Sequence, residues 1–120
     1  MYNIATLNKI SPYGLNELTD DYKLIDSLED ADGIIVRSQN MKEMDFSDNL
    51  LCIARAGVGV NNIPIKKCAE HGIAVFNTPG ANANAVKELV IGGMIAASRN
   101  FVDAANWSES LKSGELSIAK

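Results

Sequence analysis

The chain has 120 residues, 47% of them hydrophobic, and a formal net charge of −4, which together indicate about one folded domain. No stretch gathers Lys and Arg, so nucleic acid is not expected as a partner. The longest apolar segment, 89–97, is far shorter than the roughly 20 residues that cross a bilayer, so neither a membrane nor a signal peptide is predicted.

Short apolar runs alternate with helical segments, which is typical of an α/β domain with a parallel sheet. Ser11 and Pro12 predict the start of a short helix, residues 28–33 a short helical turn, and 64–71 a helix that stops at Gly72. The third and fourth strands contain continuous apolar runs, which favours cover on both faces of the sheet. Five segments are predicted as strands: Tyr2–Leu7, Tyr22–Ile25, 33–38, 50–55 and 73–76.

Residues 84–101 follow the period of a long helix. One stripe of this helix is apolar, and Ile91 and Ile95 lie on the opposite side. A helix that is apolar nearly all round is covered on more than one side. We therefore expect one face to pack on the sheet of its own domain, and the other on a partner domain or subunit. Residues 102–120 are predicted as a loosely helical linker.

Polar and glycine-rich segments follow three of the predicted strands. Ligands of open parallel sheets bind beyond the carboxyl ends of the strands. Two arginines and glycine amides at one such edge favour an anion-binding site, although arginines that only pair with surface carboxylates are an alternative. The candidate site residues are Arg37, Ser38, Arg55, Gly57, Val58 and Gly59.

The segment G-V-G-V-N-N at 57–62 partly matches a dinucleotide-binding fingerprint. However, Asn62 replaces the third glycine, and Asn77 ends the next strand where that fingerprint needs an acidic residue. We interpret the segment as a substrate-binding turn whose amides face a carboxylate.

Other reactive side chains offer weaker candidates. His71, the only histidine, is predicted at a helix C-terminus, at the end of the sheet away from the candidate site. Cys52 and Cys68 have no histidine beside them in the sequence and form no disulfide framework, which favours a reduced, cytoplasmic protein. Neither a metal site nor a nucleophile is predicted.

Three motifs in order resemble the NAD-dependent D-2-hydroxyacid dehydrogenases: I-I-V-R-S at 34–38, A-R-A-G-V-G-V-N-N-I at 54–63 and G-I-A-V-F-N-T-P-G at 72–80. The resemblance covers nearly the whole chain and is greatest to the branch of the family that oxidises 3-phosphoglycerate. Asn61 departs from the pattern, because the family usually has Asp there.

The resemblance implies a flavodoxin-like, doubly wound parallel sheet over residues 1–100, which is the family's substrate-binding domain. The helix 84–101 then crosses toward a Rossmann domain that these 120 residues do not include. Arg37 and Arg55 would hold anionic parts of the substrate, the amides of Val58 and Gly59 would lie near its carboxylate, and Val58 would lie against the nicotinamide end of NAD. The catalytic Arg, Glu and His come later in the family, so no catalytic residue is assigned.

In the complete, homo-oligomeric enzyme, the resemblance implies hydride transfer from 3-phosphoglycerate to NAD in serine biosynthesis. The 120 residues alone are expected to be inactive and to bind no NAD. Two alternatives remain: a dehydrogenase for glyoxylate, hydroxypyruvate or D-lactate, and a stand-alone flavodoxin-like binding module. A phosphorylation receiver is disfavoured, because Asn8 and Arg37 stand where it needs acidic residues.

Overall fold

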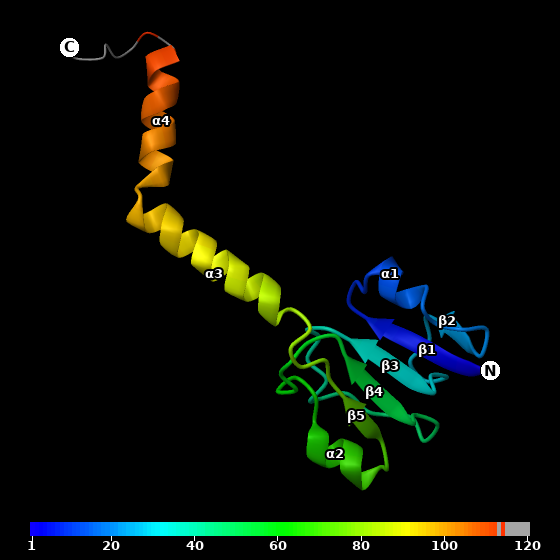
Figure 1. Ribbon diagram of the computed structural model, residues 1–120. Coiled ribbons are helices and arrows are strands. Elements are labelled where there is room, and N and C mark those ends of the chain that lie inside the picture. Colours follow the sequence, from blue (N-terminus) through cyan, green and yellow to red (C-terminus); the bar gives the residue numbers. More distant parts are fainter. Residues whose placement is uncertain (113, 115–120) are drawn as a thin grey trace. The chain divides into compact units, whose positions relative to one another are not determined.

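The chain divides into two units, Met1–Ala81 and Asn82–Lys120. A computed structural model describes residues 1–112 and 114. The first unit contains a five-stranded sheet with two short helices, and the described part of the second contains two helices (Figure 1).

All strand pairs of the sheet are parallel, and the strand order is β2-β1-β3-β4-β5. This is the flavodoxin-like order, which confirms the predicted fold class. The first two strands have the predicted bounds, and the other three are one or two residues shorter at one or both ends. The strands are β1 (Tyr2–Leu7), β2 (Tyr22–Ile25), β3 (Gly33–Val36), β4 (Cys52–Arg55) and β5 (Ala74–Phe76).

The two helices of this unit are α1 (Pro12–Leu15) and α2 (Ile65–Glu70). Ser11 is the N-cap residue of α1, although its side chain makes no capping hydrogen bond. Gly72 follows α2 with φ +71°, a left-handed conformation that glycine adopts without steric cost. Both helices are therefore close to the predicted segments.

The helical turn predicted at 28–33 is shorter than expected, and Gly33 begins β3 as predicted. The turn has one backbone hydrogen bond, from the Ala31 amide to the Leu28 carbonyl at 3.4 Å, and one from the Asp30 amide to Ser27 Oγ at 3.4 Å. Asp32 then pairs with β1: its amide donates to the Asn3 carbonyl at 2.9 Å, and its carboxylate accepts from the Asn3 amide at 2.6 Å. This pairing draws the chain into the sheet before a helix can continue.

The hydrophobic core lies on one face of the sheet. Ile53 and Val36 are completely buried there. The connection between β3 and β4 supplies Met41 and Leu50 to cover this face, and α2 supplies Cys68. The core side chains are Ala5, Ala31, Ile34, Val36, Met41, Leu50, Ile53, Ile63, Cys68 and Ile73.

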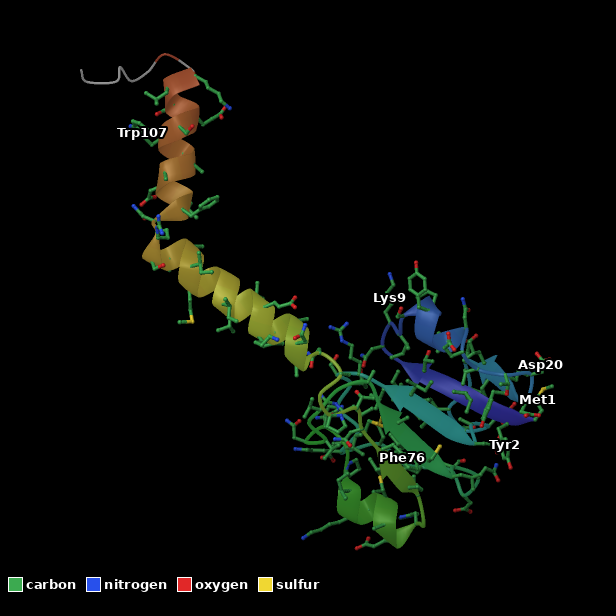
Figure 2. All side chains as sticks on the ribbon, in the orientation of Figure 1. Met1, Tyr2, Lys9, Asp20, Phe76 and Trp107 are labelled. Carbon is green, nitrogen blue, oxygen red and sulfur yellow. The ribbon has the colours of Figure 1, made fainter. Side chains whose placement is uncertain are left out.

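The opposite face of the sheet is only partly covered among the residues that the structure describes. Leu24 is 48% exposed and Phe76 59% exposed, and the tilted rings of Tyr2 and Tyr22 lie 6.1 Å apart (Tyr2 and Phe76 are labelled in Figure 2). The prediction that the strands are covered on both faces is therefore not met within these residues. The helix α1 adds little cover, because it is a single turn without a buried residue.

The second unit contains α3 (Ala83–Ser98) and α4 (Phe101–Lys112). The helix predicted over 84–101 ends earlier, because Asn100 has φ +49°, which a continuous right-handed helix cannot include. The segment predicted as a loose linker forms a regular helix up to residue 112. Asn100 provides the break, and Ser98 and Arg99 are the last residues before it.

Neither α3 nor α4 has a buried residue, and exposed side chains project from both (Figure 2). Leu89 on one side is 77% exposed, and Ile91 and Ile95 on the other are 49% and 59% exposed. Among the described elements of this unit, α3 contacts α4 alone. The expectation that one face of the long helix packs on the sheet stays a prediction. No described helix has the combined length and hydropathy of a membrane span.

Candidate functional site

The exits of β3 and β4 lie side by side at the carboxyl edge of the sheet (Figure 1). Val36 pairs with Arg55 in the parallel register, so Arg37 follows directly beside the end of β4. The Ala56 amide donates to the Val36 carbonyl at 2.8 Å and extends this pairing past the strands. The structure thus brings the predicted segments after the two strands together.

Arg55 makes two hydrogen bonds to neutral groups. Its Nε donates to the Arg37 carbonyl at 3.0 Å, and its Nη1 donates to the Gly59 carbonyl. A guanidinium has five N–H donors, so the remaining ones are available to a ligand. The ion pairs among the described residues involve neither Arg55 nor Arg37, so the alternative in which these arginines pair with carboxylates is wrong for this part of the chain.

Gly57 and Gly59 leave space for the Arg55 guanidinium. A Cβ atom on Gly57 would lie 3.2 Å from Nη1 of Arg55, and one on Gly59 would lie 3.3 Å from the same atom. Contacts this short would force the arginine to move. The two glycines therefore let the Arg55 side chain lie against the turn that follows its own strand.

The three consecutive carbonyls of this turn all accept hydrogen bonds from within the protein. The Gly57 carbonyl accepts from the Thr78 amide at 3.0 Å, the Val58 carbonyl accepts from Asn77 Nδ2 at 2.7 Å, and the Gly59 carbonyl accepts from Arg55. In a planar trans peptide, the N–H points opposite to the preceding carbonyl. The amides of residues 58, 59 and 60 thus point away from these internal donors.

Those three amides have no acceptor among residues 1–112 and 114. A row of unpaired N–H groups beside an uncompensated guanidinium is suited to an oxyanion. The Gly57 amide is an exception, because it donates to the Arg55 carbonyl at 2.9 Å. The site thus offers the amides of residues 58–60 but not that of Gly57.

Ser38 is more restricted than the sequence indicates. Asn8, at the end of β1, accepts the amides of Ser38 and Gln39 with its Oδ1, each at 2.8 Å. Asn8 has φ +73°, a left-handed conformation that Asn tolerates better than most residues. Its side chain links the ends of β1 and β3 and occupies the Ser38 and Gln39 amides. The unpaired amides are therefore those of the turn after β4. Asn8 is not among the predicted site residues, although Asn is a residue whose side chain often hydrogen-bonds the backbone in turns.

The other reactive groups lie away from this edge or are chemically quiet. His71 follows α2 and its Nδ1 lies 2.8 Å from the Lys67 carbonyl, before β5 begins. Burial raises the pKa values of the Cys52 and Cys68 thiols, which keeps them protonated at neutral pH. Within the described part of the chain, no group of three His, Cys, Asp or Glu side chains could hold a metal ion.

The turn lacks the features of a pyrophosphate cradle. Asn62 joins it to the connection between β3 and β4: its Nδ2 donates to the Gln39 carbonyl at 2.8 Å, and its carbonyl accepts the Met41 amide at 2.9 Å. A pyrophosphate cradle would need a glycine and a helix N-terminus at this point. The Val58 side chain, predicted to lie against nicotinamide, is 52% exposed.

Comparison with known proteins agrees with this geometry. Residues 4–116 match the family described as D-isomer specific 2-hydroxyacid dehydrogenase, catalytic domain. The chain is 42% identical over 96 residues to D-3-phosphoglycerate dehydrogenase of Methanocaldococcus jannaschii, covering 78% of this chain and 18% of that protein. It is 38% identical over 112 residues to hydroxypyruvate reductase of Thermotoga maritima, covering 91% of this chain and 36% of that protein.

Solved structures show the same fold. The NAD⁺-bound 3-phosphoglycerate dehydrogenase of Entamoeba histolytica is 30% identical, with a TM-score of 0.68 over 79% of this chain and 38% of that one. A glyoxylate/hydroxypyruvate reductase of Sinorhizobium meliloti gives a TM-score of 0.78 over 92% of this chain and 39% of that one, at 24% identity. The chain spans 18% and 36% of the two curated relatives named above. The family match over 4–116 shows that the chain belongs to the D-isomer specific 2-hydroxyacid dehydrogenases, as its motifs predict.

Proposed function

We propose that this chain is the substrate-binding part of an NAD-dependent D-3-phosphoglycerate dehydrogenase. The observation that carries the proposal is the turn after β4, where the amides of residues 58–60 are unpaired among the described residues and the Arg55 guanidinium, which contacts the same turn, has no carboxylate partner there. The complete enzyme would oxidise 3-phosphoglycerate to 3-phosphohydroxypyruvate in the cytoplasm, for serine biosynthesis. Its partners would be a nucleotide-binding domain and further copies of the same chain.

The site residues would divide the anionic groups of the substrate between them. The amides of Val58 and Gly59 would hold the carboxylate, and Arg55 would neutralise its charge. Arg37, exposed and without an ion pair among the described residues, would reach the phosphate together with the Ser38 hydroxyl. Hydrogen bonds to charged groups contribute about 1.5–3 kcal/mol each, so these contacts account for substrate affinity.

The role of these residues is orientation and charge neutralisation rather than proton transfer. NAD, when bound to the complete enzyme, would supply the hydride acceptor, and the exposed Val58 side chain would contact its nicotinamide end. None of the six site residues is a general base, so the 120-residue chain alone is expected to form no NADH from 3-phosphoglycerate. Turnover by the purified chain in an absorbance assay would contradict this assignment.

The proposal is tested by titrating the ¹⁵N-labelled chain with 3-phosphoglycerate and following amide and guanidinium signals by NMR. The wild-type chain should show shifts at Gly59 and at Arg55 Nε. Arg55→Ala should weaken binding about 10-fold to 150-fold, as expected for a lost charge-assisted contact of about 1.5–3 kcal/mol. Arg99→Ala, an arginine of the second unit, is the matched control and should leave the affinity unchanged. Equal binding by Arg55→Ala and wild type would contradict the proposal.

A second function is hydroxypyruvate reduction, which the long match to the Thermotoga maritima protein favours. The two candidates differ at the phosphate. If the chain serves a phosphorylated acid, Arg37→Ala should weaken binding of 3-phosphoglycerate but not of D-glycerate, which lacks the phosphate. If Arg37→Ala affects neither ligand and hydroxypyruvate binds more tightly than 3-phosphoglycerate, the second function is correct.

A further inference from the structure

Asn77 links the exit of β5 to the candidate site. It is the first residue after β5, and its Nδ2 donates to the Val58 carbonyl at 2.7 Å. The next residue, Thr78, donates its amide to the Gly57 carbonyl at 3.0 Å. Two consecutive residues after β5 thus hold two consecutive carbonyls of the turn after β4.

The bond from Asn77 decides which side of one peptide faces the ligand. The Val58 carbonyl and the Gly59 N–H belong to the same planar trans unit and point in opposite directions. Rotation of this unit would turn a carbonyl, instead of an N–H, toward a bound anion. Because glycine adopts left-handed and right-handed backbone conformations at little cost, Gly59 itself does not prevent that rotation. A donor that holds the Val58 carbonyl does prevent it.

We propose that Asn77 is a positioning residue that keeps the Gly59 N–H directed at the carboxylate of the substrate. The inference rests on the proposed function, and it adds a residue that acts through the Val58 carbonyl and does not touch the ligand. The side chain at position 77 must donate a hydrogen bond, which the Asn amide does. An ionised Asp carboxylate only accepts hydrogen bonds and would repel both the carbonyl and the anion.

The first test needs no ligand. In ¹⁵N spectra of the 120-residue chain, Asn77→Ala should shift the Gly59 amide signal, because the peptide unit that contains it is no longer held. Asn3→Ala is the matched control, because Asn3 Nδ2 also donates to a backbone carbonyl, that of Asp30 at 3.1 Å, at the start of β1. A Gly59 amide signal that moves no more in Asn77→Ala than in Asn3→Ala would overturn the inference.

The second test adds 3-phosphoglycerate. Loss of one orienting hydrogen bond should weaken binding to Asn77→Ala about threefold to tenfold, and Asn77→Asp should weaken it more. The shift at Gly59 should disappear, whereas the Arg55 Nε signal should still respond to the ligand. If both responses fall together with the stability of the chain, or if both stay as in wild type, Asn77 is not a positioning residue. If the wild-type chain does not bind the ligand, the proposed function fails, and the ligand-free spectra still decide the role of Asn77.

Discussion

The two units of the chain differ in how their apolar side chains are covered. In Met1–Ala81, Ile53 and Met41 are completely buried in one continuous core. In the described part of Asn82–Lys120, both helices are regular but have no buried residue. Regular secondary structure is thus present in both units, whereas a hydrophobic core is present only in the first.

The two units also differ in what they contribute to the candidate site. Every group of the candidate anion site, from Arg37 to Thr78, belongs to the unit that has its own core. A buried scaffold holds such groups within the small tolerances that binding requires. The apolar residues of α3 have no core within their own unit, and contiguous apolar surface on a helix favours association.

The largest expected effect contrasts an isoleucine from each unit. Ile53→Ala removes a completely buried side chain and should lower the free energy of unfolding by about 2–5 kcal/mol. Ile95→Ala removes one that is 59% exposed and should change it by less than about 0.5 kcal/mol. Urea denaturation followed by circular dichroism measures both. Similar losses in the two variants would show that the second unit has a core of its own.

Self-association through α3 is the second expected effect. Ile91 and Ile95 lie on one side of the helix and are half-exposed or more. If a second copy covers them, Ile91→Lys with Ile95→Lys should raise the dissociation constant at least about tenfold, since burying an isoleucine contributes about 1.5–3 kcal/mol. Sedimentation velocity across concentrations measures the constant. Tyr13→Lys, at an aromatic position of the first unit that is 88% exposed, is the control. A wild-type chain that stays monomeric at millimolar concentration would contradict this expectation.

The third effect tests how precisely the first unit shapes its site. Gly57→Ala places a Cβ 3.2 Å from Nη1 of Arg55 and should displace the guanidinium. We expect a loss of about 1–2 kcal/mol in the binding of 3-phosphoglycerate, in the range of other overpacked sites, with little change in overall stability. Gly14→Ala, which has no atom within 4 Å of its new Cβ, is the control. Unchanged binding by Gly57→Ala would show that Arg55 does not need this space.

The sequence predicts the first unit better than the second, for a physical reason. Apolar runs such as 50–55 predict strands, because buried strands need apolar side chains. The ends of these strands then place Arg37 and Arg55 at one edge of the sheet. Single side-chain hydrogen bonds between distant positions carry no such periodic signal. The placement of Asn8 over the Ser38 amide and the pairing of Asp32 with Asn3 depend on residues about 30 positions apart.

The helix break at Asn100 has a different origin. Its left-handed conformation ends α3, yet the apolar pattern continues through Phe101 and Val102, both about 65% exposed. Periodicity predicts which residues could share a helix face, and it does not report whether a partner is present. For this reason the pattern predicts a single longer helix, whereas α3 ends at Ser98.

The smallest expected effect concerns the connection that closes the core of the first unit. Lys67 Nζ donates to Asp45 Oδ1 at 2.9 Å and to the Met44 carbonyl at 2.8 Å, and lies 5.4 Å from the centre of the Phe46 ring. The hydrogen bond from Lys67, and then its charge, lower the pKa of Asp45. A lowered folded-state pKa means that the ionised form stabilises the fold above the ordinary pKa of Asp, and that this contribution is lost as the pH falls through the lowered value.

Asp45→Asn should therefore be slightly less stable than wild type at neutral pH, and the two should converge as the solution becomes acidic. The difference should also shrink in high salt, because the Asp45 carboxylate is fully exposed and its charge is screened. Urea denaturation at a series of pH values measures it, with Asp48→Asn on the same connection as control. A difference that persists unchanged in acid would mean that Asp45 acts through its shape or its other contacts rather than through its charge.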